Sequence, residues 1–199
     1  MKKLLPILSV LMCIKIYAQT ARQPWEVRVM HCIHKDSSKF EDRFYRGISP
    51  TVVPVGIAAP TGLILAGFIN KDEALKRDGY RAGATFILNS ALTVGIKYSI
   101  RRTRPFKKCP DLFCNKARHV GPLSFPSGHT STAFATATSL TLATKKWYVA
   151  VPAYAWASGV AYSRMYLGVH YPSDILGGMV IGIGSSFLVW KVDQWLQKK

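Results

Sequence analysis

Acidic residues are scarce in this chain. Only 10 of its 199 residues are Asp or Glu, against 27 Lys or Arg, so the formal net charge is +17. Such an excess is typical of nucleic-acid-binding proteins, but here the cations are scattered between apolar segments and do not gather on one element. Membrane-protein loops and phosphate-binding sites both use Lys and Arg and explain the excess better. We therefore expect no nucleic-acid partner.

Cysteine is also rare, with four residues in the chain. Cys109 and Cys114 bracket a short loop, and either a disulfide in an oxidising compartment or two free thiols fits this spacing. His31 and His34 flank Cys32, but no carboxylate or second cysteine pair stands where it would complete a zinc site. The sequence therefore predicts no metal centre.

The N-terminus has the pattern of a secretory signal. A basic start at residues 2–3 is followed by an apolar stretch over residues 4–14 and an imperfect cleavage site at residues 16–18. An uncleaved signal anchor is the alternative. We interpret residues 1–18 as a signal peptide or signal anchor and residues 19–199 as one domain.

Five stretches with few charges determine the expected fold class. The first is long enough to cross a bilayer, and the other four are at or below the usual lower limit. We expect an all-α fold, a compact helical bundle with five transmembrane helices in the mature chain plus the N-terminal signal segment. Gly178 and Gly182, four residues apart, are expected to pack closely against another helix. The stretches are residues 47–70, 82–96, 130–144, 147–163 and 175–190.

A short amphipathic helix is expected before the first of these stretches. Ser38 and Glu41 match a capping box, and Phe40, Phe44 and Tyr45 follow at helical spacing. The helix either lies on a membrane surface or packs against the core.

The expected topology places one basic loop outside the membrane, although basic loops usually lie on the cytoplasmic side. With the N-terminus inside, the basic segments 71–77, 145–146 and 198–199 also fall inside, as the positive-inside rule prefers. The loop 101–125 then lies outside, although residues 101–108 are strongly basic. This exception indicates a function for these cations.

The first motif is the segment that begins this loop. Lys97 and Arg104 are seven residues apart, or two helical turns, so both are expected on one helix face. Pro105 is expected to end that helix shortly after Arg104.

The second motif is the sequence SFPSGHTS at residues 124–131. Ser127 is suited to cap a helix whose first-turn amides, together with His129, face an anion. The plainer alternative is an ordinary helix cap with a partly exposed histidine.

The third motif combines a histidine with a helix start. Pro172 suits the first turn of the last helix, so His170 precedes that helix and Asp174 lies in its first turn. The carboxylate is placed to hold one imidazole nitrogen and leave the other lone pair free for attack. The alternative is an aspartate that caps its own helix beside an incidental histidine.

Together the three motifs resemble a known family signature. Lys97-x6-Arg104-Pro105, Pro126-Ser127-Gly128-His129 and Ser163-Arg164-x5-His170-x3-Asp174 are similar to the tripartite signature of the type 2 phosphatidic acid phosphatase (PAP2) superfamily. Every defining position matches in order and in spacing. The similarity covers residues 97–174 directly.

The resemblance implies metal-independent hydrolysis of a phosphoric monoester or diphosphate through a phosphohistidine, with no cofactor. It implies that His170 is the nucleophile, that Asp174 orients it, and that His129 is the general acid. The residues implied to bind the phosphate are Lys97, Arg104, Ser127, Gly128 and Arg164. Arg101 and Arg102 inherit no role and are expected to contact headgroups or solvent.

The resulting expectation is a lipid phosphatase of the bacterial inner membrane with a periplasmic active site. Its partners are a phosphorylated lipid substrate and the membrane, and no obligate protein partner is implied. A soluble periplasmic acid phosphatase of the same superfamily is the main alternative. A vanadium haloperoxidase ranks third, and a non-catalytic lipid carrier would not need the histidines.

Overall fold

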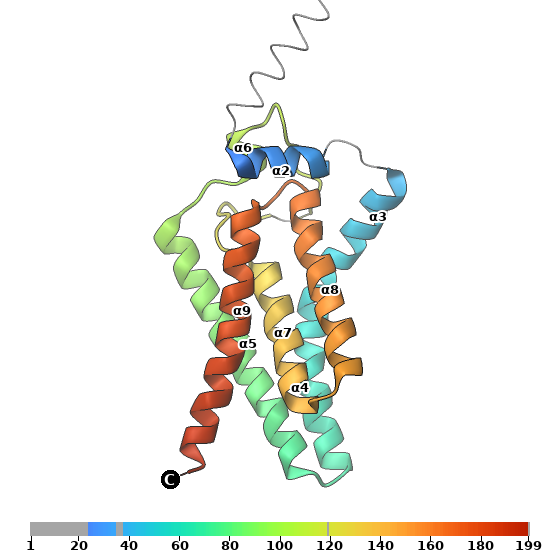
Figure 1. Ribbon diagram of the computed structural model, residues 1–199, viewed down its shortest axis with the longest axis vertical. Helices are drawn as coiled ribbons and strands as arrows, with labels where there is room; N and C mark the ends of the chain where they lie inside the picture. Colours follow the sequence, from blue (N-terminus) through green and yellow to red (C-terminus); the bar gives the residue numbers. More distant parts are fainter. Residues whose placement is uncertain (1–23, 35–37, 119, 199) are drawn as a thin grey trace, which may run out of the picture.

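The protein folds as a bundle of long helices with short helices across one end (Figure 1). The computed structural model describes residues 24–34, 38–118 and 120–198. The signal segment expected at residues 1–18 lies outside them. The predicted all-α fold is confirmed for the described residues. The helices are α2 (Trp25–His34), α3 (Lys39–Ile48), the 3-10 turn η1 (Ser49–Thr51), α4 (Val52–Ile69), α5 (Glu73–Ile100), α6 (Pro105–Lys108), α7 (Gly128–Thr144), α8 (Trp147–Tyr166) and α9 (Pro172–Leu196).

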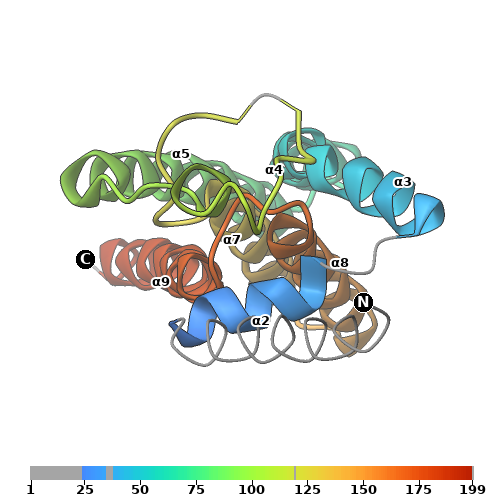
Figure 2. The ribbon, with the colours of Figure 1, turned by 90° about the horizontal axis from the view of Figure 1, so that it is seen from above.

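Helix α7 is the central helix, with α4, α5, α8 and α9 arranged around it (Figure 2). Its small side chains allow these close approaches, since Ala133 and Ala137 are fully buried against α8 residues such as Ala157. The close packing predicted for Gly178 is confirmed, because a Cβ atom there would lie 2.7 Å from the carbonyl oxygen of Ser127. Gly182 packs against α7 in the same way.

The end of α5 differs from the prediction. Arg101 adopts a left-handed conformation with φ 52°, and its amide donates to the Lys97 carbonyl, so the helix ends at Ile100. Pro105 begins α6, with Arg104 as its N-cap. Proline suits the first position of a helix, because the amide hydrogen that it lacks would have no partner within the helix there. The prediction that Lys97 and Arg104 share one face of a helix ended by Pro105 is therefore wrong.

The short helices lie across the end of the bundle where α8 ends and α9 begins (Figure 1). Val27 and Met30 of α2 form a buried cluster with Phe113 of the long loop and Tyr171. The capping box of Ser38 and Glu41 is confirmed at the start of α3. Helix α3 leaves Phe40 78% exposed, so this aromatic ring does not pack against the core.

Two helical stretches are long and apolar enough to cross a membrane by length and composition, residues 39–69 and 172–196. Large apolar side chains are also exposed along the outer surfaces of α5 and α8. Examples are Ile87 at 71% and Val151 at 61%. The count of five membrane crossings stays a prediction.

Candidate active site

The three sequence motifs meet at one end of the bundle. Helix α5 ends there with Lys97 in its last turn, and α8 ends there with Arg164 in its last turn. Helix α7 begins there with Ser127 as its N-cap, as predicted. Helix α9 also begins there, with Pro172 at its first position and Asp174 in its first turn, again as predicted. Four helix ends therefore present the motif residues to one small region.

His170 is held between an arginine and a carboxylate. Its Nε2 atom lies 3.1 Å from Arg104 Nη1, and its Nδ1 atom lies 3.5 Å from Asp174 Oδ2. An arginine only donates hydrogen bonds, so Nε2 must be the unprotonated nitrogen. The hydrogen of the neutral ring is then on Nδ1, facing the carboxylate. The lone pair of Nε2 points toward Arg104.

The pKa of His170 favours the same neutral form. The side chain is only 2% exposed. Burial, with the nearby charges of Arg104 and Arg164, lowers the pKa of His170 well below its usual value of 6.5, although Asp174 opposes the shift. At neutral pH the imidazole therefore carries no proton on Nε2. Burial also lowers the pKa of Arg104, to about 10, so its guanidinium stays charged at neutral pH.

Asp174 is fully buried, and hydrogen bonds fix its orientation. Its Oδ2 atom accepts hydrogen bonds from the hydroxyl of Ser124 and, at 2.8 Å, from the backbone amide of Tyr171. Its Oδ1 atom accepts from Arg102 Nη1 at 2.7 Å. A buried carboxylate needs such donors to remain charged.

Arg102 belongs to the site, although none of the three motifs specifies it. It was expected to contact solvent or lipid headgroups, and this expectation is wrong, because its guanidinium forms an ion pair with Asp174 and another with Glu26 of α2. The motif positions gave no sign of this role, and Glu26 is distant in sequence. Arg101 is exposed, as expected.

Lys97 binds the loop that leads into α7. Its Nζ atom donates to the carbonyl oxygens of Leu123, Ser124 and Pro126 at 3.3, 3.2 and 2.6 Å. The ammonium group thus holds the segment that carries the second motif. Burial lowers the pKa of His129, and the charges of Arg164, Arg104 and Lys97 lower it further, to about 3.

Arg104 and Arg164 are buried cations, each only 5% exposed. Arg104 Nε donates to the Gly121 carbonyl at 2.6 Å, and Nη1 donates to the Val169 carbonyl at 2.8 Å. Arg164 Nη1 donates to Ser49 Oγ at 2.5 Å, whereas Arg164 Nε has no hydrogen-bond partner among the described residues. A buried N–H group without a partner is costly unless a ligand accepts its hydrogen bond.

Ser127 and Gly128 form the start of α7. Ser127 is fully buried and caps the helix, because its hydroxyl accepts from the backbone amide of Thr130 at 3.4 Å. The same oxygen also accepts from the Thr130 hydroxyl at 2.9 Å. A Cβ atom at Gly128 would lie 3.7 Å from Thr93, an ordinary contact. Protein packing therefore does not require glycine at this position, in contrast to Gly178 and Gly182.

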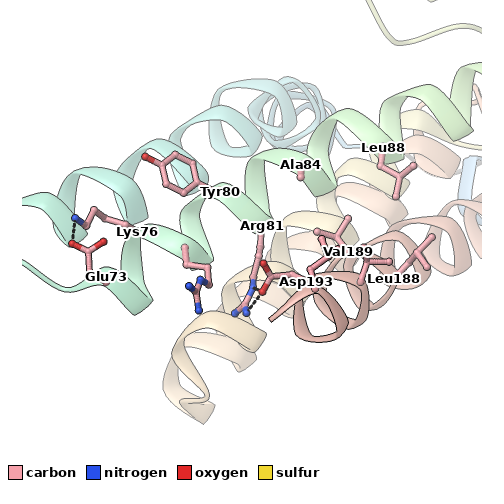
Figure 3. Close-up of a pocket in the computed structure, with 12 residues that line it drawn as sticks. Glu73, Lys76, Tyr80, Arg81, Ala84, Leu88, Leu188, Val189 and Asp193 are labelled. Atoms are coloured by element: carbon pink, nitrogen blue, oxygen red, sulfur yellow. Dashed lines mark hydrogen bonds and ion pairs between the residues drawn. The ribbon is translucent and has the colours of Figure 1, made fainter. Parts of the chain in front are cut away.

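A groove lies at the other end of the bundle. It has a volume of about 710 Å³ and runs between α5 and α9, from Lys76 and Arg77 to Leu88 and Leu188. Figure 3 shows that an Arg81–Asp193 ion pair joins the two helices within it. None of the motif residues lines this groove. The cysteines Cys32, Cys109 and Cys114 are all free thiols in the structure.

An all-helical bundle that gathers two histidines, a carboxylate and three cations at one end is suited to bind and transfer phosphate. The sequence model of the PAP2 superfamily matches residues 79–198. The chain therefore belongs to the PAP2 superfamily, as the three motifs predicted.

Relatives of this chain carry the names of lipid phosphatases. An undecaprenyl-diphosphatase of Sulfolobus acidocaldarius is 30% identical over 127 residues, 57% of this chain and 56% of that protein. A lipid A 4′-phosphatase of Bacteroides thetaiotaomicron is 33% identical over 84 residues, 42% of this chain and 37% of that protein. The match thus spans about half or less of the length of these relatives.

A solved structure resembles the fold over nearly the whole chain. It is a transmembrane PAP2-type phosphatidylglycerolphosphate phosphatase from Bacillus subtilis, with a TM-score of 0.68 and 25% sequence identity. The superposition covers 94% of this chain and 95% of that protein.

Proposed function

We propose that this protein hydrolyses the phosphate or diphosphate ester of a membrane lipid through a phosphohistidine formed on His170. The observation that carries the proposal is the state of the His170 ring. Its Nε2 lone pair faces the buried guanidinium of Arg104, and its Nδ1 hydrogen faces Asp174. A buried, neutral and oriented imidazole is a nucleophile without further activation.

In the first step, His170 Nε2 attacks phosphorus, and the bond between phosphorus and the leaving oxygen breaks. The negative charge of the bound phosphate offsets the nearby cations and favours the protonated form of His129, at the start of α7. Protonated His129 gives its proton to the leaving oxygen, which departs as the lipid alcohol or the lipid monophosphate. In the second step, His129 takes a proton from water as the water oxygen attacks phosphorus. The phosphorus–nitrogen bond breaks, and inorganic phosphate leaves with His170 neutral again.

The charge of the transferring group is balanced by fixed donors. In this proposal Arg104 and Arg164 Nε, which has no hydrogen-bond partner in the described part of the chain, bind equatorial oxygens, and Lys97 adds its charge. The amide of Gly128 at the helix start is the expected backbone donor, with the cap residue Ser127 beside it. These side chains supply the positive charge that phosphoryl transfer needs.

A lipid substrate and a membrane location are proposed because apolar side chains are exposed around the bundle. These side chains face outward along the long helices, as expected for a surface in contact with lipid. Lys71, Arg77 and Lys145 lie near the opposite end of the bundle from the site. With these cations inside, the site opens at the outer face of the inner membrane.

The test is phosphate release in detergent from a panel of lipid phosphates. The panel holds phosphatidate, phosphatidylglycerol phosphate, undecaprenyl diphosphate and lipid A, with p-nitrophenyl phosphate as a soluble control. The wild type should prefer a lipid, and His170→Ala should lose activity while its melting temperature in detergent stays close to that of the wild type. Undiminished turnover in that variant contradicts the mechanism.

Fractionation tests the location separately. The protein should stay in the membrane pellet after an alkaline carbonate wash and should dissolve only with detergent. Recovery in the periplasmic wash without detergent would instead support the soluble acid phosphatase.

A further inference from the structure

Helix α2 reaches the active site with the carboxylate of Glu26. Glu26 Oε2 accepts a hydrogen bond from Arg102 Nη2 at 2.6 Å. Its other oxygen accepts from the backbone amide of Ser173 at 3.2 Å and from the Ser173 hydroxyl. Ser173 is in the first turn of α9, where a negative charge is favourable. Glu26 therefore joins α2 both to Arg102 and to the start of the helix that carries Asp174.

Arg102 links Glu26 to Asp174 with one planar group. Nη1 donates to Asp174 Oδ1 at 2.7 Å and to Ser173 Oγ at 2.6 Å, while Nη2 contacts Glu26. The guanidinium also lies over the Tyr171 ring, 4.2 Å from its centroid. Contacts to three side-chain partners and to an aromatic ring leave the group little freedom to move. Asp174 Oδ1 thus accepts the hydrogen bond from Arg102, and Oδ2 is the oxygen that faces His170.

The charges of the three groups explain why Glu26 is needed. Arg102 by itself would neutralise Asp174, and a neutral pair stabilises the positive charge of an attacked imidazole poorly. Glu26 balances Arg102, so the set of two carboxylates and one guanidinium keeps one net negative charge. That charge lies in a buried region, where it acts strongly on a neighbouring ring.

We propose that Glu26 and Arg102 are positioning residues for the reaction. They fix the Asp174 carboxylate against His170 and preserve its net charge. This inference rests on the proposed function. Glu26 lies outside residues 79–198, the part of the chain that matches the PAP2 model.

The test compares Glu26→Gln, Arg102→Gln and the double variant with the wild type. Each single change should lower kcat about 10- to 100-fold, because an oriented partner of a reacting group is lost. KM should change less than about 2-fold, since neither residue contacts the phosphate in this proposal. The double variant should be no slower than the slower single variant, because the two residues act as one unit. Arg102→Lys should recover part of kcat.

Arg101→Gln is the matched control, since Arg101 is the neighbouring arginine, is exposed, and its side chain donates to the Tyr98 carbonyl of its own helix. It should keep wild-type kcat and KM. Wild-type kcat in Glu26→Gln and Arg102→Gln would overturn the inference. The inference would also be overturned if the kcat losses of the two single variants multiplied in the double variant. A loss of kcat fully accounted for by a lowered melting temperature would overturn it too.

A second measurement does not depend on turnover. In histidine-labelled protein, the proton resonance of His170 Nδ1 reports the nearby carboxylate. It should move upfield in Glu26→Gln and Arg102→Gln and stay in place in Arg101→Gln, and an unchanged resonance in all three overturns the inference. Failure of the proposed function has a different signature, namely a wild type that releases no phosphate or a His170→Ala variant that still does.

Discussion

Arg104 Nη1 lies 3.1 Å from the lone pair nitrogen of His170. The same guanidinium is tied to the carbonyl oxygens of Gly121 and Val169, so its position is set by the backbone of two separate loops. The arginine thus fixes which imidazole nitrogen carries the proton, and it places a positive charge beside the nitrogen that attacks in the proposed mechanism.

Arg104→Lys tests this geometry. A lysine has one nitrogen and cannot reach two carbonyl groups and the imidazole together, so kcat/KM should fall about 100-fold, the effect typical of losing one transition-state donor. The measurement is steady-state phosphate release from the best lipid of the panel. The same substitution at the exposed Arg101 should have no effect. Activity within a few-fold of the wild type would show that charge alone is sufficient at position 104.

The pH dependence of stability tests the burial of His170. Its folded-state pKa is lowered well below 6.5, so the unfolded chain binds this proton more readily than the folded chain. Stability should therefore fall as the pH drops below about 6.5, by at most ~1.4 kcal/mol per pH unit from this group. His170→Gln should lose this contribution, so its melting temperature should decline less between pH 7 and pH 5. Equal declines in both proteins would contradict a neutral buried ring.

Gly182→Ala tests the packing of α9 on α7. A Cβ atom at position 182 would collide with the Ser131 carbonyl oxygen and lie 2.9 Å from the amide nitrogen of Ala135, both parts of the rigid backbone. We expect a loss of about 1–3 kcal/mol of stability, as for other overpacked cores. Gly184→Ala is the control, because a Cβ there meets nothing within 4 Å. Thermal unfolding in detergent should show a lowered melting temperature for Gly182→Ala and an unchanged one for Gly184→Ala.

Gly168→Ala tests the turn that precedes His170. Gly168 has φ 73°, and a Cβ atom there would lie 2.5 Å from the Cys114 carbonyl oxygen. The substitution should cost about 1–3 kcal/mol and displace His170, so kcat should fall as well. Gly47→Ala, in α3 and with no described atom within 4 Å of the added Cβ, should retain both stability and activity. Similar losses in the two variants would argue against strain at Gly168.

The helix starts were predictable because their signals are local. Ser127 caps α7, and Pro172 opens α9, by hydrogen-bonding and steric rules that act within one turn. The helix lengths were less predictable. Apolar patterning indicated residues 82–96, but α5 runs from Glu73 to Ile100, since charged residues extend a helix beyond its apolar part.

The sequence by itself determined the helical fold, the three motifs and the family, because apolar stretches, caps and motif spacing are properties of neighbouring residues. Only the tertiary structure decided that Arg104 lies beyond the end of α5 and that Arg102 bridges Glu26 and Asp174. A long cationic side chain can reach carboxylates on any element that folds near it. The residues next to it in the sequence therefore do not predict which carboxylate it will pair with. The physical reason is burial. Asp174 is fully enclosed, so its charge requires a partner, and the fold supplied Arg102.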